Sequence, residues 1–393
     1  MSLKGFSFSV CDAAIKKPGL PDVALIMSDY PAVAAAVFTT NAVKAAPVLL
    51  SMERIQQGFC QALLVNSGNA NACTGAQGMQ DAVAITDKLA ALLDIEPDLL
   101  QVSSTGVIGV PLPVERFMAS LPALVAGIGS ASIEDLARAI MTTDTFPKMV
   151  ERSAEYDGVR YTIAGVSKGA GMIMPNMATM LSFVMTDATL DSTFIQEVFR
   201  TAVDRSFNAI TIDGDTSTND TCLFMANGAA GTAPIAAGTS AAETFANLLD
   251  EVLLELAKLI VKDGEGATKF VTITVQGARH DADAKCAAMA IANSSLVKTA
   301  FFGQDANWGR IFAAVGYSGA TVNQEHLSLA FDDVMMAKDG VFCGGDAEQR
   351  GTVVLHKPEF TVTVDLGLGD GHATVFTSDL SHEYVSINAD YRT

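Results

Sequence analysis

Patterns typical of helices and of strands alternate along this chain, and the alternation is the feature that most constrains its fold. Apolar residues recur at helical spacing over 79–93, 194–203 and 245–259. Short runs rich in apolar and β-branched residues lie among them, at 33–38, 62–65, 161–166, 181–185, 270–275 and 361–366. Strand and helix patterns do not follow one another in the regular βαβ order of a doubly wound sheet. We therefore predict a mixed α/β fold in which helices cover sheets.

Local signals refine this picture at two places. Ser240 is followed three residues later by Glu243, which is the pattern of a capping box, so we expect the third helix to open at Ser240. From about residue 276 the strands become shorter, and Asp-Gly and Gly-Gly turns become more frequent. We therefore expect a main domain over 1–275 and a smaller C-terminal lobe over 276–393.

Composition excludes several classes of partner. The chain has 25 lysines and arginines against 44 aspartates and glutamates, a formal charge of −19, which repels phosphate backbones and anionic membranes. We expect neither nucleic acid nor membrane as a partner.

The N-terminus carries no secretory pattern, and the longest apolar helix pattern contains acidic residues, so we place the protein in the cytoplasm. No two of the six cysteines form a Cys-x-x-Cys pair, which indicates free thiols.

Three familiar motifs are imitated but not completed. The glycine-rich runs at 168–171 and 264–269 lack the remaining residues of a dinucleotide or P-loop fingerprint. The run from Asp213 to Asn219 begins like a calcium loop, but Thr218 and Phe224 occupy the positions that need glycine and glutamate. We interpret it as a polar turn and predict no metal site. No Gly-x-Ser-x-Gly elbow supports a serine–histidine triad.

The segment 168–187 favours a different nucleophile. A glycine-rich turn leads to the small residue Ala178, and Thr179 then opens a strongly apolar strand. This arrangement suits self-cleavage: the threonine hydroxyl attacks the preceding carbonyl, the acyl group moves from nitrogen to oxygen, and water hydrolyses the ester. The product is a free threonine amine beside its own hydroxyl.

That amine can act as the base for its own hydroxyl. An α-amine titrates near 7.7–8.0 against about 10.4 for lysine, so a useful fraction is neutral at working pH. The β-branched side chain also has few χ1 rotamers, which holds the oxygen in place. Taken alone, however, a threonine in this context is more often an ordinary strand residue.

Long blocks spread over the chain settle the interpretation by resemblance. The chain resembles the glutamate N-acetyltransferase family of arginine biosynthesis, also called ornithine acetyltransferases. The blocks that carry the resemblance are KGAGMIMPNMATML at 168–181, NSGNANACTG at 66–75, STGVIG at 104–109, TTDTFPK at 142–148, DGDTSTNDT at 213–221, KDGEGATK at 262–269, DANWGRI at 305–311 and INADYRT at 387–393.

The resemblance implies a role for each matching residue. Cleavage would fall between Ala178 and Thr179, with Thr179 as the nucleophile, and Thr105 with Gly106 would form the oxyanion hole. The substrate-binding positions would be Thr142, Lys168, Thr179, Glu265, Asn388 and Thr393. Thr143, which is adjacent to Thr142, is an alternative to it.

The resemblance also implies the architecture and the reaction. The fold would be a four-layer αββα sandwich with a smaller C-terminal α/β lobe. An α chain (1–178) and a β chain (179–393) would stay together as an α2β2 heterotetramer. Thr179 would take the acetyl group from N2-acetylornithine and pass it to glutamate in a ping-pong reaction that needs no metal or organic cofactor. Some members of the family also use acetyl-CoA, and the sequence does not decide this point.

Two alternatives remain open at this stage. One is a self-processed aminopeptidase or amidase of the same fold group, which would give the acyl group to water. The other is an inactive homologue that keeps the fold for binding. Dependence on an amino-acid acceptor distinguishes the first alternative from a transferase, and self-cleavage distinguishes the second.

Overall fold

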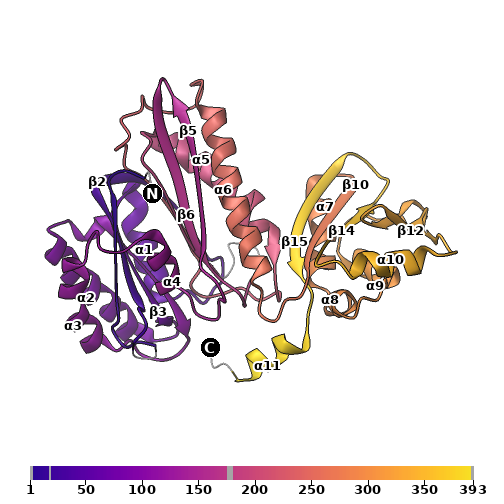
Figure 1. Ribbon diagram of the computed structural model, residues 1–393, viewed down its shortest axis with the longest axis horizontal. Coiled ribbons are helices and arrows are strands. Elements are labelled where there is room, and N and C mark those ends of the chain that lie inside the picture. Colours follow the sequence, from indigo (N-terminus) through magenta and orange to yellow (C-terminus); the bar gives the residue numbers. More distant parts are fainter. Residues whose placement is uncertain (1–2, 17–18, 175–179, 391–393) are drawn as a thin grey trace. The chain divides into compact units, whose positions relative to one another are not determined.

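The computed structural model describes residues 3–16, 19–174 and 180–390. Contacts between Cα atoms divide the chain into two compact units. Of the described residues, those up to 208 and those in 215–260 belong to the first unit, and those in 209–214 and 261–390 belong to the second. Figure 1 shows the elements of both units, coloured along the sequence. Each unit is described by itself below.

An eight-stranded sheet forms the centre of the first unit, with strand order β4-β3-β2-β9-β7-β6-β5 and with β1 paired to β2. The strands are β1 (Phe6–Cys11), β2 (Val23–Phe38), β3 (Phe59–Asn69), β4 (Leu100–Val107), β5 (Lys148–Tyr156), β6 (Val159–Lys168), β7 (Leu181–Thr186) and β9 (Thr221–Ala226). The helices are α1 (Ala46–Arg54), α2 (Gly75–Leu93), α3 (Val114–Ala126), α4 (Ile133–Ala139), α5 (Ser192–Arg205) and α6 (Ala242–Lys262).

The long strand β2 belongs to both halves of this sheet. Its N-terminal part pairs with β1 and β3, its C-terminal part pairs with β9, and the register is irregular between Met27 and Ala32. One buried cluster joins apolar side chains from the two halves, among them Ile26 of β2, Phe183 of β7 and Leu223 of β9. The two halves of the sheet therefore pack face to face across a shared core.

Helices cover the outer faces of both halves. On one side, Leu25 and Leu64 share a cluster with α2 and α3, because alternate residues of a strand point to opposite faces. On the other side, the ring of Phe245 in α6 packs on Tyr161 of β6 and Phe224 of β9, with ring centroids 6.0 and 6.3 Å apart. Figure 1 shows α6 running along β5 and β6. This is the expected four-layer αββα arrangement.

Two local expectations need correction. The strand predicted at 33–38 is only the end of β2, which begins at Val23 and continues through Pro31. The third helix begins at Ala242 and not at Ser240. A turn precedes it, in which the Thr239 hydroxyl donates to the Ala236 carbonyl and the Ala242 N–H donates to the Thr239 carbonyl. Ser240 is therefore not the N-cap, and Glu243 lies one position too early for a capping box.

The second unit has a seven-stranded sheet with the order β13-β12-β11-β14-β10-β15-β8. The strands are β8 (Ile210–Thr211), β10 (Phe270–Ala278), β11 (Ser328–Phe331), β12 (Val334–Lys338), β13 (Val341–Phe342), β14 (Glu359–Asp365) and β15 (Gly371–Ser378). The helices are α7 (Asp281–Asn293), α8 (Ser295–Phe302), α9 (Trp308–Tyr317), α10 (Ala347–Leu355) and α11 (His382–Asp390). Strand β10 pairs with β14 and β15, so residues 270–275 lie in this unit although the sequence placed them in the main domain.

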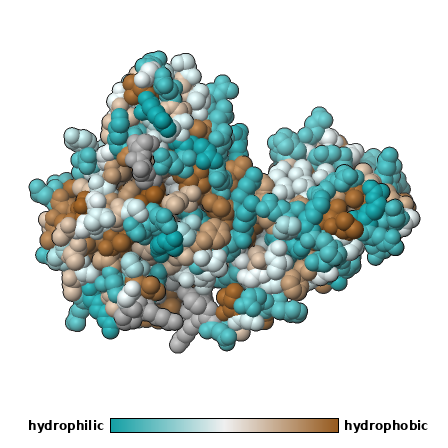
Figure 2. Space-filling model, viewed as in Figure 1, coloured by the Kyte–Doolittle hydropathy of each residue, from teal (hydrophilic) through white to brown (hydrophobic). Residues whose placement is uncertain are grey.

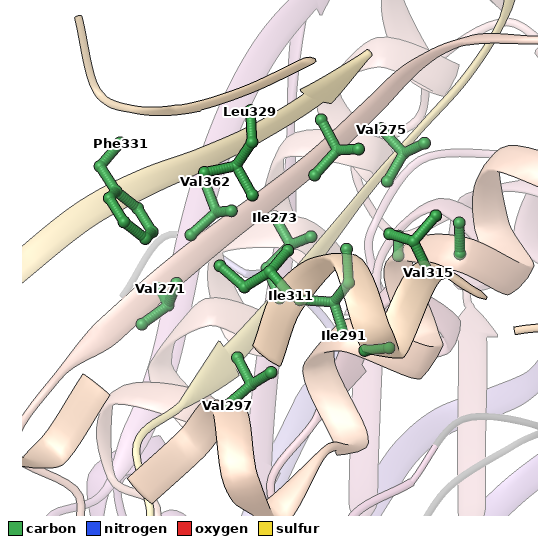
Figure 3. Packing of buried hydrophobic residues seen from close by; sticks show 14 of the residues in the cluster. Val271, Ile273, Val275, Ile291, Val297, Ile311, Val315, Leu329, Phe331 and Val362 are labelled. Carbon is green, nitrogen blue, oxygen red and sulfur yellow. The ribbon is translucent and has the colours of Figure 1, made fainter. Parts of the chain in front are cut away.

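The core of the second unit lies between its sheet and the helices α7 to α9. Val271, Ile273 and Val275 alternate along β10 and point to one face, where they meet Ile291 of α7 and Ile311 of α9 (Figure 3). All of these side chains are almost completely buried. The strand predicted at 270–275 from its apolar and β-branched residues is thereby confirmed as part of β10.

The surface carries both hydrophilic and hydrophobic residues. Figure 2 shows hydrophilic residues over much of one face, with hydrophobic residues in smaller groups between them. None of the helices in the described part of the chain is both long and apolar enough to cross a membrane. All six cysteines are free.

Candidate active site

Segments that are distant in sequence meet at one edge of the first unit's sheet. Strand β6 ends at Lys168, which pairs with Leu181 at the start of β7, and Leu181 in turn pairs with Thr221 at the start of β9. Strand β5 begins beside them at Lys148. Thr105 lies near the C-terminal end of β4, and its hydroxyl oxygen is 3.4 Å from the Lys168 ammonium. The edge therefore collects the ends of strands from both halves of the sheet.

The ammonium group of Lys168 is the centre of this cluster. It donates hydrogen bonds to the hydroxyl oxygens of Thr142 at 2.7 Å and Thr105 at 3.4 Å, and it lies 3.8 Å from a carboxylate oxygen of Asp144. The side chain of Lys168 is only 7% exposed. The structure thus brings three of the predicted site residues together around one cation, and Thr142 rather than Thr143 supplies the hydroxyl.

Gly106 is required by the close approach of two backbones. It pairs with Gly68 of β3, and its φ of +131° is one that side-chain-bearing residues rarely adopt. A Cβ atom at this position would lie 2.3 Å from the carbonyl carbon of Gly68. A rigid backbone atom cannot rotate away as a side chain can. The glycine pair therefore fixes the backbone geometry directly beside Thr105.

Gly106→Ala is expected to destabilise the protein by more than the backbone strain of about 1–3 kcal/mol, because the overlap with Gly68 adds to it. Gly109→Ala is the matched control: it also has a positive φ, of +80°, but nothing lies within 4 Å of its added Cβ. Denaturant unfolding of both variants measures the difference. Equal losses in the two variants would show that the close approach to Gly68 has no energetic consequence.

A buried carboxyl group, that of Asp220, accepts a hydrogen bond from the residue that follows the predicted nucleophile in sequence. Asp220 is 2% exposed and accepts the Met180 N–H at 2.9 Å. Burial raises the pKa of Asp220 well above its ordinary value, although the Met180 N–H lowers it. The neighbouring Asn219 donates from its side chain to the carbonyls of Ser104 and Ala70, at 2.9 and 2.7 Å. The start of β9 is thereby linked by hydrogen bonds to Ser104 of β4 and to Ala70, which follows β3.

Two further predicted positions meet in the second unit. The Asn388 side chain, in α11, donates to a Glu265 carboxylate oxygen at 2.8 Å and to the Tyr384 carbonyl at 3.0 Å. Ala178, Thr179 and Thr393 lie outside the described residues. The roles assigned to these residues in catalysis and substrate binding therefore stay predictions. The observed contacts are those of Lys168 with Thr105 and Thr142, and of Asn388 with Glu265.

The charged residues that support this cluster, Asp144 and Lys148, were not among the site residues predicted from the sequence. Asp144 and Lys148 lie within the block TTDTFPK, but only Thr142 of that block was assigned a role. Their side chains are fully buried, and Asp220 is almost so. Charged residues are usually exposed, so their identity alone does not reveal burial. The one available signal was a lysine four residues after an aspartate, which is too common a spacing to indicate a buried pair.

Comparisons with known proteins match the whole length of the chain. Residues 7–393 match the ArgJ family. The arginine biosynthesis bifunctional protein ArgJ of Geobacter sulfurreducens is 67% identical over 393 residues, and the protein of the same name from Syntrophotalea carbinolica is 55% identical, each over 100% of both chains. Among solved structures, ArgJ from Bacillus halodurans is 41% identical with a TM-score of 0.53, covering 54% of this chain and 100% of that chain. The chain therefore belongs to the ArgJ family.

Proposed function

We propose that this protein is a glutamate N-acetyltransferase of arginine biosynthesis, which moves an acetyl group from N2-acetylornithine to glutamate. The observation that carries the proposal is the match to the ArgJ family from residue 7 to residue 393, with bifunctional arginine-biosynthesis relatives aligned over their full length. The cluster around Lys168 supports it, because it places a cation and two hydroxyl groups at the end of the sheet from which Thr179 is expected to act.

The first step in this proposal is self-cleavage. The Thr179 hydroxyl attacks the Ala178 carbonyl carbon, the new O–C bond forms as the peptide C–N bond breaks, and the hydroxyl proton passes to the leaving nitrogen. Water then hydrolyses the ester. The products are an α chain over 1–178, which ends in a carboxylate, and a β chain over 179–393, which begins with the amine of Thr179.

Acetyl transfer then uses the same hydroxyl. The neutral α-amine takes the hydroxyl proton as the oxygen attacks the acetyl carbonyl, and Thr105 with the backbone of Gly106 stabilises the resulting oxyanion. Collapse of this intermediate releases ornithine, which receives the proton, and leaves the acetyl group on Thr179. The glutamate amine attacks that ester in the second half-reaction and restores the free hydroxyl.

Charged groups would select the amino-acid substrates. Both ornithine and glutamate carry an α-carboxylate, and Lys168 beside Thr142 is the cation that we assign to it. Glu265 and the terminal carboxylate of Thr393 are assigned to the ammonium groups, with Asn388 holding Glu265 by a hydrogen bond. No metal or organic cofactor takes part in these steps. The bifunctional name of the relatives also supports acetyl-CoA as a second donor.

Intact mass and a denaturing gel test the first step, and an acceptor assay tests the second. We expect two fragments that divide between Ala178 and Thr179, and acetyl release from N2-acetylornithine that depends on glutamate. Turnover at full rate without glutamate would favour the amidase alternative. A single uncut and inactive chain would favour a binding homologue. The same preparation, in native mass spectrometry, tests the α2β2 assembly that we propose for the protein in the cytoplasm.

Thr105→Ala is expected to slow acetyl transfer about a hundredfold, because the developing oxyanion loses one hydrogen-bond donor. The turnover number of the processed enzyme is the quantity to measure. Thr201→Ala, on the exposed surface of α5, removes a hydroxyl that bonds only within its own helix and serves as the control. An unchanged turnover number in Thr105→Ala would remove this residue from the oxyanion hole.

A non-cleavable extension after Thr393 is expected to raise the Michaelis constant for N2-acetylornithine while self-cleavage continues. The extension converts the terminal carboxylate into an amide, so one of the proposed ammonium partners is lost. Steady-state kinetics of processed enzyme with the same tag on either terminus provides the comparison. Identical constants for both amino acids in the two tagged proteins would argue that Thr393 does not contact substrate.

A further inference from the structure

A fully buried ion pair lies behind the Lys168 cluster and has no role in the steps above. The Lys148 ammonium is 2.7 Å from Oδ1 of Asp144, and neither side chain is exposed to solvent. Burying two charges costs desolvation energy that their attraction does not reliably repay, so such a pair is poor evidence for stability alone. A function in the site would explain why these two residues occupy a place that apolar side chains could fill.

The two oxygens of Asp144 face different partners. Oδ1 accepts from the Lys148 ammonium and from the Gly169 N–H, the latter at 2.6 Å. Oδ2 accepts from the Thr142 N–H at 3.0 Å and lies 3.8 Å from the Lys168 ammonium. One carboxylate thus joins the loop before β5 to the end of β6. It accepts the backbone N–H of Thr142 and lies beside the Lys168 ammonium, which in turn donates to the Thr142 hydroxyl.

Charge balance explains the presence of Lys148. Burial alone raises the pKa of Asp144, but the ammonium groups of Lys168 and Lys148 lower it below its ordinary value. With Lys148 on one oxygen, the carboxylate is neutralised without using the charge of Lys168. Two ammonium groups and one carboxylate leave a net charge of +1. Of the two lysines, Lys168 is the one whose ammonium contacts the Thr105 hydroxyl.

We propose that Asp144 is a positioning residue for acetyl transfer, which fixes Lys168 and Thr142 for the substrate carboxylate, and that Lys148 is its buried counter-ion. This inference rests on the proposed function, because it acts through the role of Lys168 there. Asp144 itself is enclosed and acts through its partners. The substrate feature that depends on it is the α-carboxylate common to ornithine and glutamate.

Other charged groups surround Lys168 and must be considered in any pH experiment. Lys16 lies close by: its ammonium donates to the carbonyls of Ala139, at 3.3 Å, and Met141. Burial lowers the pKa of Lys16 to about 8, and Lys168 adds to the effect while Asp22 opposes it. Asp220 also interacts electrostatically with Lys168. Asp144 is the only one of these that bonds the backbone of Thr142, so its removal has a distinct expected signature.

The experiment compares Asp144→Asn and the double variant Asp144→Asn/Lys148→Met in the full-length, processed enzyme. For Asp144→Asn, we expect kcat/KM for N2-acetylornithine to fall about 10- to 100-fold per folded molecule, mainly through KM, because the carboxylate-binding cation is misplaced. The alkaline limb of the pH profile should move to lower pH, since Lys168 loses a carboxylate that favours its protonated form.

The double variant separates positioning from stability. Lys148→Met removes the cation that Asp144→Asn leaves uncompensated, so the double variant should regain much of the thermal midpoint while it keeps the kinetic loss. Glu134→Gln is the matched control, because Glu134 and Arg138 form an ion pair with the same four-residue spacing and a 2.6 Å distance, but on the surface. It should change neither the kinetics nor the thermal midpoint.

A double-mutant cycle with Lys168→Met tests whether the effect of Asp144 on substrate binding acts through Lys168. If Asp144 acts through Lys168, Asp144→Asn should have little further effect on KM in the Lys168→Met background. An equal loss in both backgrounds, or wild-type kinetics and pH profile in Asp144→Asn, overturns the inference while the proposed function stands. Wild-type kinetics in Lys168→Met would overturn both the proposed role of Lys168 and the inference that depends on it.

Discussion

Thr179→Ala is expected to give a single chain that is never cut and has no acetyltransferase activity. One hydroxyl serves both as the attacking group in self-cleavage and as the acyl carrier in transfer, so its removal abolishes both reactions. The free α-amine that would act as base is also never formed. Intact mass spectrometry and the glutamate-dependent assay, applied to the same preparation, measure the two losses together.

Two substitutions frame this result. Thr179→Ser keeps a hydroxyl and should still be cut, with slower transfer because serine holds its oxygen less firmly about χ1. Thr193→Ala removes an exposed threonine near the start of α5 and should be processed and active. Two fragments from Thr179→Ala, divided at the same peptide bond, would show that another group performs the cleavage.

The stability of the protein is expected to rise with pH because of Lys298 in the second unit. This side chain is 3% exposed and donates to Thr377 Oγ1 at 2.9 Å and to the Ser378 carbonyl. Burial lowers the pKa of Lys298 to about 7, although Asp379 and Asp213 raise it. Between pH 7 and about 10.4 the unfolded chain therefore binds a proton that the folded chain has released, which makes the folded state more favourable as pH rises.

Lys298→Met should remove this dependence. Below pH 7 both states of the wild type hold the proton, and the full cost of a buried ammonium is present. The unfolding free energy of the wild type, relative to the variant, should gain on the order of 4 kcal/mol between pH 6 and pH 10. Denaturant unfolding at several pH values measures it, with Lys285→Met, on the exposed side of α7, as the control. Parallel curves for wild type and Lys298→Met would contradict the expectation.

Much of the fold followed from periodicity, and the exceptions have local causes. The strand at 181–185 matches β7 at Leu181–Thr186, and the helix pattern at 79–93 falls within α2 at Gly75–Leu93. By contrast, β2 extends from Val23 to Phe38 through the sequence Ser28-Asp29-Tyr30-Pro31, which is typical of a turn. The sheet bends there, so these residues mark the passage between its halves rather than the end of a strand.

The sequence blocks that resemble the family predicted individual residues of the candidate site, but not how those residues meet. Lys168, Thr105 and Thr142 come from three separate blocks, and their meeting depends on strand order, which no local pattern specifies. Asp144 and Lys148 could not be distinguished in sequence from surface charges. Their importance depends on burial, which is a property of the folded sheet edge and not of their neighbours in the chain.

The order of strands in the first unit has a consequence for the processed enzyme. Strands β9 and β7 come from the proposed β chain, and they lie between β4-β3-β2 on one side and β6-β5 on the other, all from the α chain. Two ladders, β2 with β9 and β7 with β6, would then be the seams between separate polypeptides. Neither fragment could complete this sheet alone. The two pieces should therefore not exchange between molecules without unfolding, and fragments produced from separate genes should become native only when they fold together.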